Sequence, residues 1–215
     1  MLLHDRDLDG AERALREGLE LDPDFGLGYT WLACVLAIRL RFDESLDAVQ
    51  QALALDPLSI TTQLVACRCY FWAGRLPEAL QYAQAVVDAW SRNILGVVWK
   101  ARVLRQLGRP EEALTVLETG LEVFGQDYRL LGPLALQYAR VGRLDRAREV
   151  LGMLAGSTWD PYHGAAACAA LGDHDRALAM LRQSMALRSG LIVFLGLNAS
   201  DFGETRLHPG FQALL

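Results

Sequence analysis

The sequence of 215 residues has few of the features that mark a metal protein, a secreted protein or a membrane protein. It contains only four cysteines and no C-x-x-C pair, so we expect no zinc site and reduced, structural thiols at Cys34, Cys67, Cys69 and Cys168. No apolar stretch reaches the roughly 18 residues that cross a bilayer. The first residues lack the basic and apolar regions of a signal peptide. We therefore expect a cytoplasmic protein without a membrane partner.

Positive charge is also scarce. The formal net charge is -5 and the isoelectric point is near 5.4. Broad nucleic-acid binding needs a strongly positive surface, because the protein must displace counterions from the phosphates. The composition therefore predicts no nucleic-acid partner, although it allows a local basic patch.

Patterns that would carry catalysis are missing as well. The four histidines are scattered along the chain and are predicted to be solvated, at His4, His163, His174 and His208. No G-x-x-x-x-G-K-[ST] phosphate-binding motif occurs. The acidic pair Glu111-Glu112 opens a predicted helix, where it complements the helix dipole. We predict no catalytic residue, no cofactor and no metal, and we do not expect an enzyme.

The sequence does contain an internal repeat. Leu21-Asp22-Pro23 returns as Leu55-Asp56-Pro57, which is a step of 34 residues. Three further columns keep this step, namely Gly74, Gly108 and Gly142; Arg75, Arg109 and Arg143; and Ala79, Ala113 and Ala147. The glycines follow apolar runs, which predicts left-handed helix ends, and Pro or Asp soon follows where a new helix begins. Each repeat is therefore predicted to be a helix, a tight turn and a second helix.

Small residues recur where the two helices of a repeat would cross. One column holds Ala33, Cys67 and Ala101, and the other holds Ala79, Ala113 and Ala147. A bulky side chain at such a position would separate the helices, at a cost of roughly 1–3 kcal/mol. The pattern predicts an all-α protein whose core lies between paired helices.

These residues resemble the tetratricopeptide repeat (TPR) family, a 34-residue helix pair with small residues at the crossing and proline near the end. The resemblance implies a right-handed superhelical solenoid of stacked antiparallel helix pairs. We place four pairs in residues 26–157, at 26–59, 60–93, 94–127 and 128–157, and a shorter fifth pair at 158–189. Lys100 and Val86 depart from the family pattern. Pro133 lies early in a predicted helix, which predicts that this helix begins late.

The N-terminal residues 1–25 are predicted to form a half repeat that contains only a second helix. Leu8, Ala11, Leu15 and Leu19 share one face of that helix, and its usual partner is absent or reduced to Met1-Leu2-Leu3. Repeat arrays need a polar cap for solubility. We therefore expect an open apolar edge, with the chain either a fragment or a homodimer through this edge.

The C-terminal residues 190–215 break the repeat. They resemble the segment that closes TPR arrays in bacterial signalling proteins, through Leu207, Pro209, Phe211, Leu214 and Leu215. His208 stands where an aspartate is usual. The resemblance implies a short final helix from about Pro209 that covers the last helix pair with Phe211 and Leu214.

In the family, the first helix of each pair lines a concave surface. The repeat register places the following residues on this face, and we predict that they form a peptide-binding groove: Thr30, Trp31, Cys34, Leu64, Arg68, Phe71, Trp72, Val98, Trp99, Arg102 and Arg105. The matching positions Ala37, Ile38, Val65 and Gln106 complete the columns. Tryptophan and arginine together favour contact with a peptide or helix that carries acidic and apolar groups.

Two alternatives stay open for this face. Trp31, Trp72 and Trp99 could instead pack between repeats as core, because tryptophan is usually deeply buried. The family also has a mode that grips a terminal carboxylate with lysines and asparagines. The matching positions here hold Arg68 and Arg102 but no asparagine, so we do not expect that clamp.

Two hypotheses for function follow. The first is a scaffold that binds another protein or peptide, either free-standing or as the sensor or adaptor part of a bacterial regulator. The second is a structural self-association module that pairs through the N-terminal edge. The sequence names neither the partner nor the process.

Overall fold

The computed structural model describes residues 7–90, 92–154 and 160–215. Leu2, Leu3 and His4, which entered the predictions above, lie outside this set. The described residues form helices and turns without a strand. They divide into two compact units, Met1–Val103 and Leu104–Leu215, which we describe separately.

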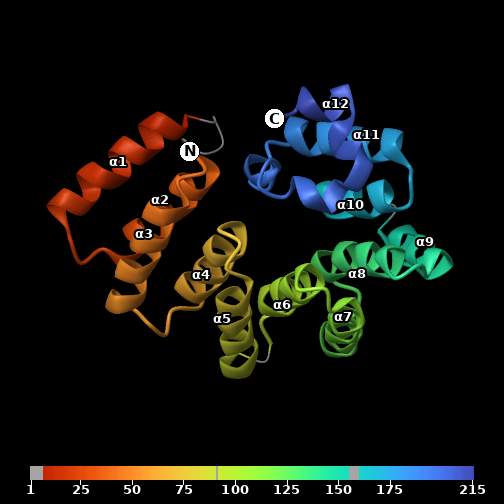
Figure 1. Cartoon of the computed structure of the whole chain (residues 1–215), viewed down its shortest axis with the longest axis horizontal. Helices are drawn as coiled ribbons and strands as arrows, with labels where there is room; N and C mark the ends of the chain where they lie inside the picture. Colours follow the sequence, from red (N-terminus) through yellow and green to blue (C-terminus); the bar gives the residue numbers. More distant parts are fainter. Residues whose placement is uncertain (1–6, 91, 155–159) are drawn as a thin grey trace. The chain divides into compact units, whose positions relative to one another are not determined.

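The first unit consists of helix pairs preceded by a single helix. Its elements are α1 (Leu8–Leu21), α2 (Gly26–Ile38), α3 (Phe42–Leu55), α4 (Ile60–Trp72), α5 (Leu76–Ala89) and most of α6 (Ile94–Gln106) (Figure 1). α2 packs on α3 and α4 packs on α5, which gives the predicted pairs. α1 packs on α2, and both α2 and α3 contact α4, so neighbouring pairs share a continuous core.

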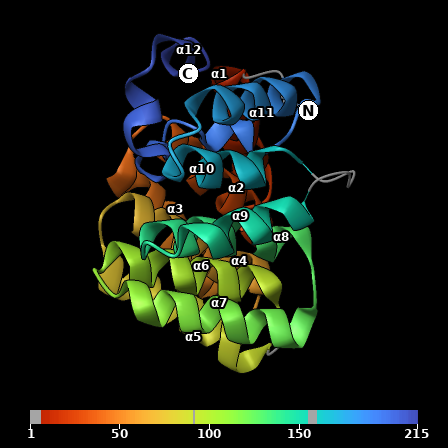
Figure 2. The same cartoon turned by 90° about the vertical axis from the view of Figure 1, so that its right-hand side faces the viewer.

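The second unit continues the pairs and ends in short helical turns. It holds the last residues of α6, α7 (Pro110–Phe124), α8 (Tyr128–Arg140), α9 (Leu144–Met153), α10 (Tyr162–Ala170), α11 (His174–Ala186), the 3-10 helices η1 (Ile192–Phe194) and η2 (Ala199–Leu207), and α12 (Pro209–Gln212). α8 contacts α7, α9 and α10, and α10 also packs on α11 and η2. Figure 2 shows α10 and α11 side by side in blue.

The predicted helix ends are confirmed at the repeated glycines. Gly74, Gly108, Gly142 and Gly172 have φ values of 77°, 74°, 77° and 80°, a left-handed conformation that glycine adopts without strain. The chain turns at once into the next helix, and the N–H of Arg75 donates to the carbonyl oxygen of Tyr70 at 2.9 Å.

The small residues of both columns are buried as predicted. Ala79, Ala113 and Ala147 have no exposed surface, and neither do Ala33 and Cys67. These positions leave no room for a larger side chain without separating the helices of a pair.

Pro133 does not delay its helix, so that prediction is wrong. α8 begins at Tyr128 and includes Pro133 in its interior. The carboxylate of Asp127 accepts a hydrogen bond from the N–H of Arg129 at 2.9 Å, which caps the helix before the proline. The cap and the burial of neighbouring residues such as Leu130 and Leu134 stabilise a helix that a proline alone would weaken.

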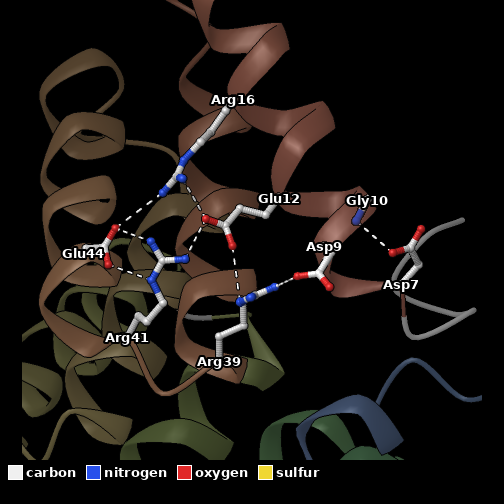
Figure 3. Close-up of polar contacts among 8 residues, drawn as sticks. All are labelled: Asp7, Asp9, Gly10, Glu12, Arg16, Arg39, Arg41 and Glu44. Carbon is white, nitrogen blue, oxygen red and sulfur yellow. Dashed lines mark hydrogen bonds and ion pairs between the residues drawn. The ribbon is translucent and has the colours of Figure 1, made fainter.

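The N-terminal edge also differs from the prediction. α1 turns Ala11 and Leu19 inward, where they are 5% and 8% exposed, and its exposed positions include Arg13, Glu17 and Glu20. Figure 3 shows further charged side chains where α1 meets the turn between α2 and α3. From Asp7 onward the edge is therefore a largely polar cap rather than an open apolar face, because the apolar stripe of α1 is used against α2.

The C-terminal helix agrees with its prediction. α12 begins at Pro209, and Phe211 and Leu214 are 0% and 7% exposed. The ring of Phe211 lies 5.2 Å from that of Phe202 in η2, measured between centroids. The closing segment therefore adds its own apolar core to the second unit.

Candidate protein-interaction surface

Arginine and aromatic side chains alternate across α4 and α6 of the first unit. The guanidinium carbon of Arg68 lies 4.9 Å from the ring centroid of Trp72 and 5.7 Å from that of Trp99. The guanidinium carbon of Arg102 lies 4.9 Å from the ring of Trp99 and 5.1 Å from that of Phe71. Stacking of a cation on an aromatic ring is worth about 0.5–2 kcal/mol, depending on exposure to solvent. We call these five residues the arginine–aromatic ladder.

The aromatic rings of the ladder also contact one another. The Trp72 and Trp99 rings meet edge to face at 6.0 Å, and Phe71 and Trp99 do so at 5.7 Å. Phe71 is buried at 8% exposure, whereas Trp72 and Trp99 keep part of their surface in solvent. The two alternatives for the tryptophans therefore both hold in part, since each ring packs on its neighbours and still reaches the surface.

Partial exposure extends to other residues of the predicted groove. Leu64 on α4 and Val98 on α6 are partly exposed, as are Arg68 and Arg102. Trp31 on α2 is 44% exposed, the largest exposed fraction among the predicted aromatic residues of the groove. A ligand on this side of the first unit would thus meet apolar and cationic groups together.

Two predicted groove residues on α2 are interior residues instead. Thr30 is 1% exposed and its hydroxyl donates to the carbonyl oxygen of Gly26 at 3.0 Å. Cys34 is fully buried, and burial raises the pKa of its thiol. The reason is that α2 packs against α1, α3 and α4, so short side chains on it do not reach the surface.

Arg105 belongs to the second unit, where it binds an acidic side chain. Its Nη2 donates to Oδ1 of Asp201 at 2.6 Å, and the two side chains are 13% and 14% exposed. Arg140 of α8 donates through Nη2 to the carbonyl oxygen of the same Asp201 at 3.0 Å. The sequence analysis missed Arg140, although the repeat step would have found it, since it follows Gln106 by 34 residues.

The histidines do not share one environment. His163 is partly buried, with its ring 5.6 Å from that of Tyr128, and burial lowers its pKa. The prediction of a solvated side chain is wrong there, because α10 packs His163 toward α8. Nδ1 of His174 lies 2.7 Å from the hydroxyl oxygen of Thr205, and Nδ1 of His208 accepts from the N–H of Gly210 at 2.9 Å. Each of these contacts orders the C-terminal turns.

The cysteine thiols are free and buried, as predicted. Burial raises the pKa of Cys67 to about 12 and that of Cys168 to about 11. Cys69 shifts in the same direction for the same reason. A thiol needs its thiolate form to act as a nucleophile, so these residues are poorly suited to covalent chemistry near neutral pH.

Polar residues at the start of α10 form a structural cluster. The carboxylate of Asp160 accepts hydrogen bonds from the hydroxyl of Ser184 at 2.7 Å, from the hydroxyl of Ser189, and from the N–H of Tyr162 at 3.0 Å. These contacts join the start of α10 to α11 and to the turn that follows it. Because Asp160 contacts serine hydroxyls and a backbone amide rather than a histidine, the cluster explains helix placement and not a catalytic relay.

A hollow of about 510 Å³ lies along α1, but its lining does not resemble a ligand pocket. All lining residues belong to that one helix, namely Asp9, Glu12, Arg13, Arg16, Glu17 and Glu20. Ligand pockets are mostly apolar with a few polar groups, whereas these side chains are charged and of both signs. In the described ranges, no three histidine, cysteine or acidic residues come close enough to hold a metal ion. None of the described helices is long and apolar enough to span a membrane.

The repeat can now be compared with known proteins. The tetratricopeptide repeat family model matches residues 32–94 and 100–158, and a second tetratricopeptide model matches residues 165–183. The chain belongs to the tetratricopeptide repeat family. No curated protein sequence matches it.

Solved TPR structures share the fold. A structure of PilF from Pseudomonas aeruginosa is 18% identical, with a TM-score of 0.62, over 93% of this chain and 92% of that one. A thermophilic TPR protein of Thermus thermophilus is 21% identical, with a TM-score of 0.62, over 85% of this chain and 100% of that one. YrrB, described as a TPR protein with an unusual peptide-binding site, is 20% identical, with a TM-score of 0.51, over 86% and 98% of the chains. These similarities establish the TPR solenoid fold and fit a protein-interaction scaffold.

Proposed function

We propose that this TPR protein binds an acidic and apolar peptide or helix on the arginine–aromatic ladder of α4 and α6. The observation that carries the proposal is the alternation of Arg68 and Arg102 with the rings of Trp72 and Trp99, all of which keep part of their surface in solvent. Tryptophan and arginine supply most of the binding energy in many protein interfaces. A carboxylate can pair with a guanidinium while an apolar side chain covers the rings.

Neighbouring residues extend this surface. Trp31, Leu64 and Val98 add exposed or partly exposed apolar area to the same unit. YrrB, which shares the fold, is described as having a peptide-binding site, and this supports a peptide as the class of ligand. The protein acts by binding rather than by catalysis, in the cytoplasm. A place in a bacterial regulator is supported by the resemblance of its C-terminal segment to those that close TPR arrays in signalling proteins.

The proposal is tested by selecting peptides from a random library displayed on phage. We expect wild-type protein to enrich peptides in which Asp or Glu lies beside Leu, Phe or Trp. Affinity, measured by fluorescence anisotropy with a selected peptide, should fall as salt rises, because surface ion pairs are screened. The double variant Arg68→Gln with Arg102→Gln should lose about ten-fold or more in affinity, the equivalent of one or two charge-assisted contacts.

A matched control uses Arg13→Gln, which removes a charge from the exposed face of α1 in the same unit. This variant should bind the selected peptide as the wild type does. Enrichment of peptides without acidic residues, or equal binding by the double variant and the wild type, would refute the ladder as the binding surface.

Self-association through α1 is the weaker candidate. The exposed positions of α1 include Arg13, Glu17 and Glu20, and like-charged copies of a polar face repel or stay hydrated. Light scattering across protein concentration should therefore give one constant mass. A mass that doubles with concentration, and that stays monomeric when Glu17 is changed to Arg, would favour pairing through this helix.

A further inference from the structure

The segment Asn198–Leu207 follows the last helix pair and contains no α-helix. It forms the 3-10 helix η2, which is interrupted at Gly203, where φ is 51°. Runs of 3-10 helix longer than three or four residues are uncommon, because their hydrogen bonds have poor geometry. The conformation of this segment, which we call the C-terminal segment, therefore depends on its contacts with other elements.

The strongest contact is a buried ion pair. Asp201 accepts a hydrogen bond from Nη2 of Arg105 at 2.6 Å, and both side chains are almost out of solvent, at 14% and 13% exposure. Arg140 holds the backbone at the same place, since its Nη2 donates to the carbonyl oxygens of Asp201 at 3.0 Å and Ser200 at 3.4 Å. Two arginines from α6 and α8 thus grip one acidic residue by its side chain and by its main chain.

These two arginines lie where a TPR protein is expected to bind its ligand. α6 and α8 are the first helices of their pairs, and Arg105 belongs to the groove predicted from sequence. Arg140 lies one repeat after Gln106, which is on the same predicted face. The C-terminal segment therefore covers first-helix positions of the second unit.

Aromatic and polar contacts complete the docking. Phe202 is 1% exposed, with its ring 6.2 Å from that of Tyr162 on α10. The amide of Asn198 donates to the hydroxyl of Tyr162 at 3.1 Å, and Thr205 contacts Nδ1 of His174 at 2.7 Å. An acid followed by a buried aromatic ring, flanked by hydrogen bonds, is the pattern of a peptide ligand rather than of a repeat helix.

We propose that Arg105 and Arg140 form a second binding site, for a partner peptide in which an aspartate or glutamate precedes an aromatic residue. In this structure the chain's own Asp201 and Phe202 occupy that site as an internal competitor. The site lies in the second unit and does not depend on the ladder of α4 and α6. A tethered segment acts at an effective concentration in the mM range for short linkers, so a partner must displace it.

The test uses a fluorescein-labelled peptide identical to residues 197–207 (LNASDFGETRL), added to the full chain. Wild-type protein should bind it weakly, because the internal copy competes. Asp201→Lys replaces the attraction to Arg105 and Arg140 with repulsion, so the site opens and the anisotropy titration should give a Kd about ten-fold lower or better. Addition of Arg105→Gln to this variant should remove the gain.

Two matched controls separate docking from general charge effects. Asp145→Lys makes the same charge change at a fully exposed side chain of α9 and should bind the peptide as the wild type does. A peptide with Asn in place of its Asp should fail to bind Asp201→Lys. The proposal is overturned if Asp201→Lys keeps its helical circular dichroism and binds no tighter than wild type, or if Arg105→Gln leaves the gain intact.

A measurement on the wild-type protein decides the matter if Asp201→Lys does not fold. Hydrogen exchange followed by mass spectrometry reports on the amides of residues 198–207. An excess of the unlabelled peptide should raise exchange in this segment and leave α11 unchanged, because only the segment is displaced. Unchanged exchange at a saturating peptide concentration would overturn the proposal, since it would make the C-terminal segment a permanent part of the fold.

Discussion

Glu12 of α1 accepts a hydrogen bond from Nη1 of Arg41 at 2.7 Å, which joins the first helix to the turn between α2 and α3 (Figure 3). The same carboxylate pairs with Nη1 of Arg16 at 2.9 Å and with Nε of Arg39 at 3.3 Å. Arg41 in turn binds Glu44 at 2.7 Å. Glu12 is only 7% exposed, so an acidic side chain that would be costly to bury is stabilised by three guanidinium groups.

Replacement of Glu12 with Gln should destabilise the first unit. The amide keeps the shape but loses the charge-assisted bonds, and it leaves three arginines close together. Because those arginines are about a third to a half exposed, we expect a loss of about 1–2 kcal/mol rather than the larger cost of a fully buried pair. Urea unfolding followed by circular dichroism measures the change. Glu17→Gln, on the exposed face of the same helix, is the control, and an equal effect of the two variants would contradict the role of Glu12.

This cluster could not be predicted from the sequence, although the helix that carries it was. The periodic residues Ala11 and Leu19 identify α1 and its buried face. Glu12 and Arg41 are separated by 29 residues and lie outside the repeat columns, so only the packing of α1 on α2 brings them together. Long-range ion pairs depend on tertiary structure, whereas helix periodicity is local.

Leu40→Gly should stabilise the protein. Leu40 has a φ of 60° and is 65% exposed, and it precedes Gly74 of the repeat column by 34 residues. The left-handed conformation costs a residue with a Cβ about 1 kcal/mol or more, while glycine adopts it freely. After the larger entropy of glycine in the unfolded chain is subtracted, the expected gain is about 0.5–1 kcal/mol. Thermal unfolding should show a higher Tm for Leu40→Gly and none for Leu58→Gly, which changes a leucine that is 78% exposed. A lower Tm for Leu40→Gly would contradict the strain argument.

Gly132→Ala should be strongly destabilising, because α8 and α10 meet at this residue. A Cβ at Gly132 would lie 2.6 Å from the carbonyl carbon of His163 and closer still to the oxygen, so the backbones would have to separate. Overpacking of this kind costs about 1–3 kcal/mol. Gly152→Ala is the matched control, since a Cβ there meets nothing within 4 Å and alanine favours the helix by up to about 1 kcal/mol. Opposite signs in urea unfolding are expected, and a neutral Gly132→Ala would show that the helices do not approach so closely.

Repeat register predicts the direction of a side chain but not its depth. Cys34 and Arg68 share a column, yet Cys34 is fully buried and Arg68 is partly exposed. The thiol is short and lies on a helix enclosed by α1, α3 and α4, whereas the long arginine stem reaches past the helix surface. Arg140 was within reach of the same register. Its partner Asp201 was not, because the C-terminal segment lies outside the repeat.

The environment of His163 predicts a pH dependence of stability in the second unit. Its ring packs against those of Tyr128 and Tyr162, at 5.6 Å and 6.5 Å. Burial lowers the pKa of His163 from its usual value near 6.5, and Arg129 acts in the same direction, while Asp160 and Asp127 oppose them. The folded protein therefore holds the neutral imidazole at a pH where the unfolded chain already binds a proton.

The sign of the effect follows from this difference. Above about pH 6.5 the imidazole is neutral in both states, so its contribution to stability is complete. As the pH falls below 6.5, the unfolded chain gains the proton first, and the protein loses at most about 1.4 kcal/mol per pH unit until the folded pKa is reached. His163→Gln cannot titrate, so its free energy of unfolding should fall less than that of the wild type between about pH 7.5 and pH 5.5. Urea titrations at both pH values measure this difference, and parallel losses in the two proteins would mean that other groups, chiefly the carboxylates, set the acid limit of the fold.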